Sequence, residues 1–183
     1  MKDRKEIDNA LSNKELYLFS LIMSVLIIAF YYITSLAIGL KKEDNIPSFL
    51  LVVFAMGVLL SFFIHELIHY VSFLYFIKWK NRDALKIGFS LKYFAPYCHC
   101  SAIISINQYR YSVIAPFIVL SFISFFIGIL IQSQMILIYS LILTLGCTGD
   151  FFILLKLRKY SKDALIKDHA TKPGCIVYVE NKN

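Results

Sequence analysis

Charge is scarce in this sequence, and three long stretches have none. Charged residues make up 17% of the 183 residues, whereas a soluble domain carries about 25%. The uncharged stretches are Leu16 to Leu40, Asn45 to Ile64 and Tyr111 to Gly149. Because about 20 apolar residues cross the hydrocarbon core of a bilayer, the third stretch is long enough for two crossings. The scarcity of charge excludes a soluble globular domain and predicts an integral membrane protein.

Other absences exclude further classes of protein. The four cysteines do not have the pattern of a secreted disulfide framework. No internal repeat or low-complexity linker divides the chain, so we expect one membrane-embedded domain over residues 1–183. The net charge of +7 does not indicate nucleic acid as a partner, since the basic residues flank the apolar runs. The lipid bilayer is the surrounding that we expect.

The apolar runs predict an all-α polytopic membrane protein with about four transmembrane helices. The expected spans are residues 16–40, 47–77, 111–131 and 135–157. Residues 1–15 are polar and would lead into the first span. Residues 158–183 would form a polar, basic tail with a short strand-like run at residues 175–179.

The segment between the second and third spans differs from the helices around it. Gly88 and Pro96 argue against a continuous helix over residues 81–110. Residues 85–90 alternate loosely, and residues 97–106 are rich in β-branched and aromatic side chains. We therefore expect a short β-hairpin or a re-entrant strand segment here. Irregular backbone at membrane depth is tolerated only where protein covers it or where it lines a cavity.

Lys and Arg residues outside the spans predict how the chain crosses the membrane. With the N-terminus inside, the cytoplasmic side receives four from the N-terminal segment, six from residues 78–110 and seven from Lys156 onward. The other side receives only the two in the first loop. Because positive residues gather on the cytoplasmic side of membrane proteins, we expect both termini in the cytoplasm.

An H-E-x-x-H pattern, His65 to His69, lies inside the second expected span. Helix positions i and i+4 share a face, so His65 and His69 can offer two imidazoles to one metal ion. Glu66 is placed to take a proton from a water on that metal, as in zinc hydrolases. A charged side chain at the centre of a bilayer costs roughly 2.5–3.5 kcal/mol. A metal site therefore explains these residues better than packing does.

Asp150 is the leading candidate for the third metal ligand. A catalytic zinc ion usually has three protein ligands and a water. Apart from Glu66, Asp150 is the only acidic residue inside the expected spans. At 1.5 Å per helical residue, His69 and Asp150 differ by only about 5 Å in depth. We expect one zinc ion bound by His65, His69 and Asp150; the alternative is that Asp150 pairs with a basic residue at the interface.

Cys98, His99 and Cys100 are the rival ligands, because thiolates and imidazole bind zinc well. In a strand, however, Cys98 and Cys100 point to one face and His99 to the other, so the three converge poorly on one ion. We expect the two thiols to lie beside an active-site cleft and His99 to contact the substrate or the transition state. All three are therefore candidates for substrate binding.

Taken together, the H-E-x-x-H helix and the later aspartate resemble the site-2 protease class of intramembrane metalloproteases. The wider pattern is similar to small bacterial membrane proteins grouped as zincin peptidases, through Tyr97–Ser101, Arg110 with Ala115-Pro116, and Gly149-Asp150. The resemblance implies a zinc-dependent endopeptidase of the bacterial cytoplasmic membrane that cuts membrane-embedded or membrane-proximal peptides, with a strand near the site that pairs with the substrate. It departs from site-2 proteases before Asp150, where Cys147 and Thr148 replace Asn and Pro, and after it, where Phe151 replaces Gly.

Two other functions compete with the endopeptidase. A catalytically silent relative would bind zinc and act as a regulatory or partner-helix-binding module, but it would have no need of Glu66. A metal or ion transporter would need more polar residues inside the spans than the sequence supplies. The presence of Glu66 favours the enzyme.

Overall fold

The structure is a computed structural model of the whole chain and describes residues 4–40, 46–91, 95–170 and 174–180. The helices are α1 Asn13–Ala37, α2 Ser48–Ile77, α3 Ile106–Pro116, α4 Ile123–Leu130, α5 Gln134–Gly146 and α6 Thr148–Leu157. The strands are β1 Arg4–Ala10, β2 Leu85–Ser90, β3 Ala95–Cys100, β4 Ile104–Ser105, β5 Leu165–Asp168 and β6 Gly174–Glu180. A 3-10 turn, Trp79–Ala84, joins α2 to β2, and a π-helical segment, Phe117–Phe122, joins α3 to α4.

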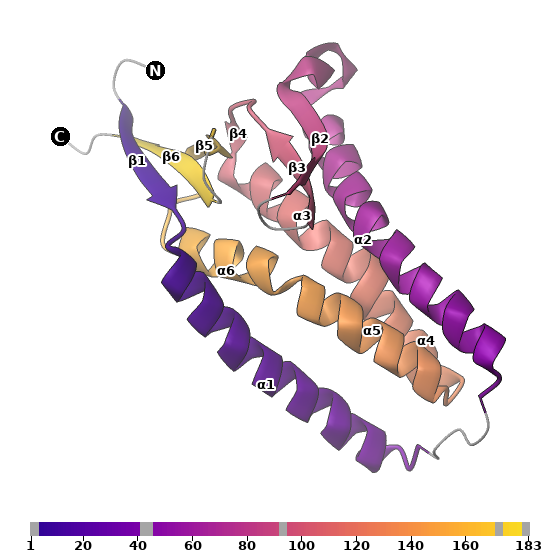
Figure 1. Cartoon of the computed structure of the whole chain (residues 1–183). Coiled ribbons are helices and arrows are strands. Elements are labelled where there is room, and N and C mark those ends of the chain that lie inside the picture. Colours follow the sequence, from indigo (N-terminus) through magenta and orange to yellow (C-terminus); the bar gives the residue numbers. More distant parts are fainter. Residues whose placement is uncertain (1–3, 41–45, 92–94, 171–173, 181–183) are drawn as a thin grey trace.

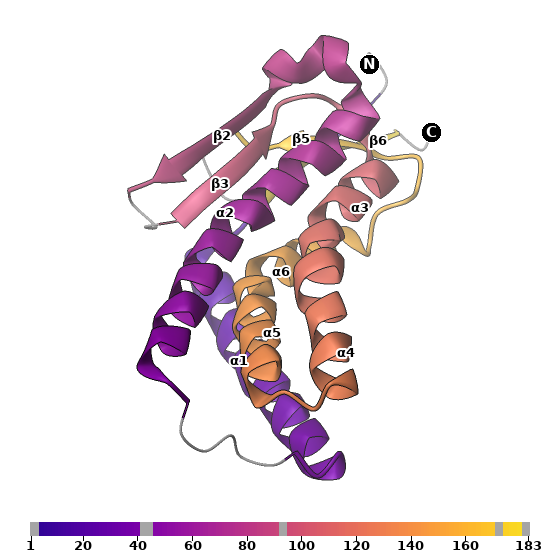
Figure 2. The same cartoon turned by 90° about the vertical axis from the view of Figure 1, so that its right-hand side faces the viewer.

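The helices run side by side, and the strands gather at one end of them (Figure 1). α1 packs against α5 and α6, while α2 packs against α3, α5 and the β2–β3 hairpin. β1 and β6, from the two ends of the chain, lie together at the same end of the bundle (Figure 1). The hairpin lies against the C-terminal half of α2 (Figure 2).

Three helices in the described part of the chain are long and apolar enough to cross a membrane. They are α1, α2 and the continuous path of residues 106–130 through α3 and α4. α5 and α6 pass the same test only as a pair, which bends by 47° at Cys147. Of the about four expected transmembrane helices, three have the length and apolar composition of a span, and the fourth, residues 135–157, corresponds to this bent pair. Side chains such as Leu21 and Leu59 are 65% and 62% exposed, as expected of a surface that faces lipid.

The third span begins at Ile106, five residues before the expected start at residue 111. Ser105 and Gln108 form a capping box, in which each side chain accepts a hydrogen bond from the other's backbone amide. Arg110 is accommodated in the first turns because its guanidinium donates to the carbonyl oxygens of Leu157 and Tyr160, at 2.6 and 3.2 Å. These carbonyls at the end of α6 would otherwise lack a helical partner.

The all-α expectation was wrong, because the two polar ends of the chain form an antiparallel sheet. The strand order is β1-β6-β5-β4, and β1 pairs with β6 from Arg4↔Glu180 to Ala10↔Gly174. The expected lead-in of residues 1–15 therefore contains a strand, and the expected tail of residues 158–183 contains two. The β2–β3 hairpin and the strand at residues 175–179 confirm two sequence predictions.

One core joins the sheet to the helix ends. Its buried members come from α2, α3, α6, the hairpin and the C-terminal strands, and include Phe73, Tyr109, Leu157, Ile166 and Val177. Burial of apolar area stabilises by roughly 25 cal/mol per Å². The sheet therefore holds the hairpin, the C-terminal half of α2 and the start of α3 in one packed unit.

We predict that Gly174→Ala destabilises the fold. Backbone strain contributes about 1–3 kcal/mol to the loss, before the steric overlap of the new Cβ is counted. Gly174 begins β6 with φ +116°, and an added Cβ would lie 2.7 Å from the carbonyl oxygen of Asn9. The matched control is Gly57→Ala in α2, where an added Cβ meets nothing within 4 Å. Thermal unfolding in detergent, followed by the fluorescence of Trp79, measures both variants. Equal melting temperatures for the two variants would contradict the prediction.

Candidate metal centre

Two helices bring three candidate metal ligands together. α2 places His65 and His69 one turn apart on one face, and α6 places Asp150 in its first turn. The Nε2 atoms of His65 and His69 lie 3.1 Å apart. Asp150 Oδ2 lies 3.1 Å from His65 Nε2, and Asp150 Oδ1 lies 3.6 Å from His69 Nε2. All three side chains are largely buried.

The bend between α5 and α6 determines where the Asp150 carboxylate lies. Because the helical axis turns by 47° at Cys147, Asp150 comes to lie in the first turn of α6 rather than in the middle of a span. Backbone N–H groups at a helix N-terminus favour a negative side chain there. The Cys147 thiol also lies 3.9 Å from His65 Nδ1, on the side of that ring away from Asp150.

A backbone contact determines the tautomer of His69. Its Nδ1 lies 2.8 Å from the carbonyl oxygen of Ser112 in α3. A carbonyl oxygen only accepts hydrogen bonds, so Nδ1 carries the proton and donates it. Nε2 then keeps its lone pair and faces His65 and Asp150. An imidazole held through its other nitrogen in this way is the usual arrangement of a metal-ligating histidine.

These three side chains fit a zinc ion. Tetrahedral zinc bonds of about 2.0–2.2 Å put neighbouring ligand atoms roughly 3.3 Å apart, close to the three separations of 3.1, 3.1 and 3.6 Å. Asp150 Oδ2 is buried and has no hydrogen-bond donor among the described residues. Two imidazole nitrogens and a carboxylate therefore converge with too few protons between them, and a cation would balance this excess of acceptors.

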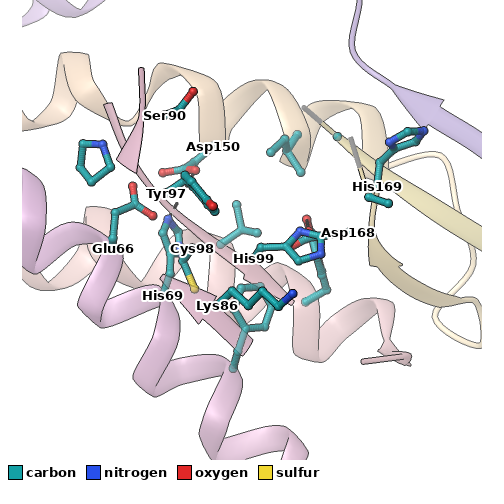
Figure 3. Close-up of a pocket in the computed structure, with 17 residues that line it drawn as sticks. Glu66, His69, Lys86, Ser90, Tyr97, Cys98, His99, Asp150, Asp168 and His169 are labelled. Carbon is teal, nitrogen blue, oxygen red and sulfur yellow. Dashed lines mark hydrogen bonds and ion pairs between the residues drawn. The ribbon is translucent and has the colours of Figure 1, made fainter. Parts of the chain in front are cut away.

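Glu66 lies beside this group without belonging to it. It is half-buried and lines a cavity of about 590 Å³ together with His69 and Asp150. Figure 3 shows its carboxylate turned toward the cavity. The backbone amide of Cys98 in β3 interacts with that carboxylate. The hairpin thus forms the wall opposite the metal-ligand helices, with Glu66 between the two.

The structure separates the three residues of the Cys98-His99-Cys100 segment. Cys98 and His99 line the cavity, whereas Cys100 lies fully buried in the core, so a substrate contact by Cys100 is not supported. Burial raises the pKa of Cys98, and it raises the pKa of Cys100 to about 12. Both thiols therefore stay protonated at neutral pH, and a thiol in that state is a poor metal ligand. In the part of the chain that the structure describes, only His65, His69 and Asp150 form a group with metal-ligand spacing.

A second polar group lines the same cavity and was not predicted from the sequence. Asp168 in β5 accepts hydrogen bonds from the Tyr109 hydroxyl and from the Cys100 amide, the latter at 2.6 Å. Its Oδ2 lies 3.7 Å from His99 Nδ1, and burial raises the pKa of the Asp168 carboxyl. Neighbouring His169, within the expected polar tail of residues 158–183, also lines the cavity. No local pattern marks these residues, because only the pairing of β5 and β6 brings them to the cavity.

Residues 58–165, more than half of the chain, match the model of a protein family described as "Putative zincin peptidase". The matched range contains the H-E-x-x-H helix, the hairpin and Asp150, and it ends three residues before Asp168. No curated protein and no solved structure matches the chain.

We predict that Asp150→Ala lowers the zinc affinity at least tenfold, because it removes one of three ligands and leaves two imidazoles without the counter-charge. Glu66→Gln should keep one zinc ion per chain, since Glu66 lies outside the ligand set. Cys147→Ser is the matched control beside the site and should also keep the ion. Elemental analysis of protein purified in detergent measures the zinc content. A full complement of zinc in Asp150→Ala would exclude Asp150 as a ligand.

Proposed function

The chain belongs to the family described as "Putative zincin peptidase", and from this premise we propose that it is a zinc-dependent endopeptidase that cleaves membrane-embedded or membrane-proximal peptides. One observation carries the proposal: His65, His69 and Asp150 converge beside Glu66 in a cavity next to helices long enough to span a membrane. Family membership implies zinc, and the donor set fits that ion.

His65, His69 and Asp150 would hold the zinc ion in the proposed enzyme. When bound, the ion supplies an electrophile that polarises the scissile carbonyl and acidifies water. The Ser112 carbonyl keeps His69 in the tautomer that this role requires.

Glu66 is the proposed general base. Its carboxylate faces the cavity next to the ligand set, and no basic side chain pairs with it in the described part of the chain. It would take a proton from the attacking water and pass that proton to the nitrogen of the leaving amine. The Cys98 amide holds the carboxylate on the cavity side, so the base would already be in place when a substrate enters.

The edge of β3 away from β2 is the proposed binding site for the peptide backbone. Among the described residues, β3 pairs with no other strand than β2. On that edge the amide of Cys98 interacts with Glu66 and the amide of Cys100 donates to Asp168, so an added peptide would replace these side-chain acceptors with its own carbonyl oxygens. An extended peptide added to such an edge gains main-chain hydrogen bonds, and alternate side chains then face the protein. Cys98 and His99 are the neighbouring residues that would contact those side chains.

The proposed location is a bacterial cytoplasmic membrane with both termini in the cytoplasm. The Lys and Arg bias of the sequence supports the orientation. The sheet, the hairpin and the ligand-bearing end of α2 would then lie on the cytoplasmic side. A catalytically silent zinc-binding module is the alternative, and the retention of Glu66 argues against it.

We predict that Glu66→Gln lowers the cleavage rate about 10²–10⁴-fold, the usual contribution of a general base, while zinc stays bound. Cells that carry wild type or the variant are compared by mass spectrometry of new protein N-termini. Glu15→Gln, an exposed acidic residue paired with Lys156, is the matched control. A zinc chelator should abolish the same cleavages, and added zinc should restore them. Identical N-termini in wild type and Glu66→Gln cells would contradict the endopeptidase.

A further inference from the structure

Two basic side chains lie opposite each other on the hairpin, at some remove from the metal ligands. Lys86 in β2 and His99 in β3 are direct cross-strand partners, and both line the cavity. Directly opposite residues of an antiparallel pair share a face and have Cβ atoms about 4.5–5.5 Å apart. In the view of Figure 3, Glu66 lies on one side of the cavity, and Lys86 and His99 lie toward Asp168 on the other.

This pairing places an ammonium group and an imidazole, both hydrogen-bond donors, on one face of the hairpin. In the described part of the chain, no acidic side chain lies within 4.0 Å of the Lys86 ammonium. Asp168, which also lines the cavity, accepts hydrogen bonds from Tyr109 and Cys100. Lys86 is exposed and lines the cavity, so its ammonium can meet an anionic ligand there.

Asp168 lies beside the ring of His99. Its side chain is 12% exposed and lies 3.7 Å from His99 Nδ1, while His99 itself is 25% exposed. Asp168 Oδ1 accepts from the Tyr109 hydroxyl, and Asp168 Oδ2 accepts from the Cys100 amide. These two donors fix the carboxyl group beside His99. Contact at Nδ1 leaves Nε2 for a ligand.

We propose that Lys86 and His99 form a subsite for a carboxylate of the peptide substrate, and that Asp168 is the positioning residue of His99. With Asp168 beside Nδ1, Nε2 is the ring nitrogen that can donate a hydrogen bond to the substrate carboxylate. The inference rests on the proposed function in that it takes the ligand to be a peptide. The carboxylate belongs either to an acidic side chain or to the peptide's C-terminus.

Three peptides of one sequence distinguish these sources. They are Ala-Leu-Ala-Glu amide, Ala-Leu-Ala-Gln amide and Ala-Leu-Ala-Gln with a free C-terminus, all N-acetylated. Binding to zinc-loaded Glu66→Gln, which prevents cleavage, is measured by titration calorimetry in detergent. We expect the Glu amide or the free acid to bind at least tenfold more tightly than the Gln amide; the first result indicates a side chain and the second a C-terminus.

Further variants test which residues cause the tighter binding of the peptide that carries the carboxylate. Lys86→Gln or His99→Gln should reduce it to less than threefold, whereas Lys80→Gln, an exposed lysine outside the cavity, should leave it unchanged. Asp168→Asn should reduce it too, but should add nothing when His99 is already Gln, because Asp168 acts through that ring. Additive losses would mean that Asp168 has only a structural role, and melting temperatures check that each variant folds.

Equal binding of the three peptides, or binding of none, would overturn the subsite. This result is distinguishable from failure of the proposed function. If the chain is no peptidase, the carboxylate preference persists while wild type and Glu66→Gln cells show the same N-termini. If only the subsite is wrong, the N-termini differ between those cells and the preference is absent.

Discussion

Three hydrogen-bond acceptors meet inside an apolar helix bundle, and the surrounding structure is arranged to hold them there. His65 and His69 come from α2, Asp150 comes from the start of α6, and the carbonyl that orients His69 comes from α3. Such a convergence of buried acceptors is costly without a cation. The bend between α5 and α6 and the close contact of α2 with α3 bring these atoms from α2, α3 and α6 to one point.

The two ends of the bundle are stabilised differently. At the sheet end, helix termini and strands share a conventional apolar core. Along the spans, apolar side chains face outward and gain little from packing against one another in lipid. Polar contacts link the helices there instead: Tyr31 binds Ser140 and Thr144 at 2.6 and 2.9 Å, and Ser61 binds Tyr139 at 2.5 Å. The cavity lies between the apolar core of the sheet end and the helices of the spans, with the metal ligands on the helix side and the hairpin on the sheet side.

Local pattern predicted the parts of the site that lie close together in the chain. A pair of histidines one helical turn apart needs only a helix to converge, and the apolar run around His65 predicts that helix. The hairpin was visible in the same way, because Gly88 and Pro96 interrupt the helical pattern. Of the sheet, only the strand at residues 175–179 was visible, since Arg4 and Glu180 pair across 176 residues and β1 is polar. Asp168 was missed for the same reason.

The sequence by itself determined that the chain has helices apolar and long enough to cross a membrane, that one of them carries two imidazoles and a carboxylate within five residues, and that a strand segment interrupts these helices. These follow from composition and from the periods of helix and strand, which are properties of a few neighbouring residues. Only the tertiary structure decided that Asp150 reaches the histidines, that Cys100 is buried while His99 faces the cavity, and that the C-terminal strands complete its wall. Those outcomes depend on helix crossing, on the bend at Cys147 and on long-range strand pairing, and no local pattern encodes them.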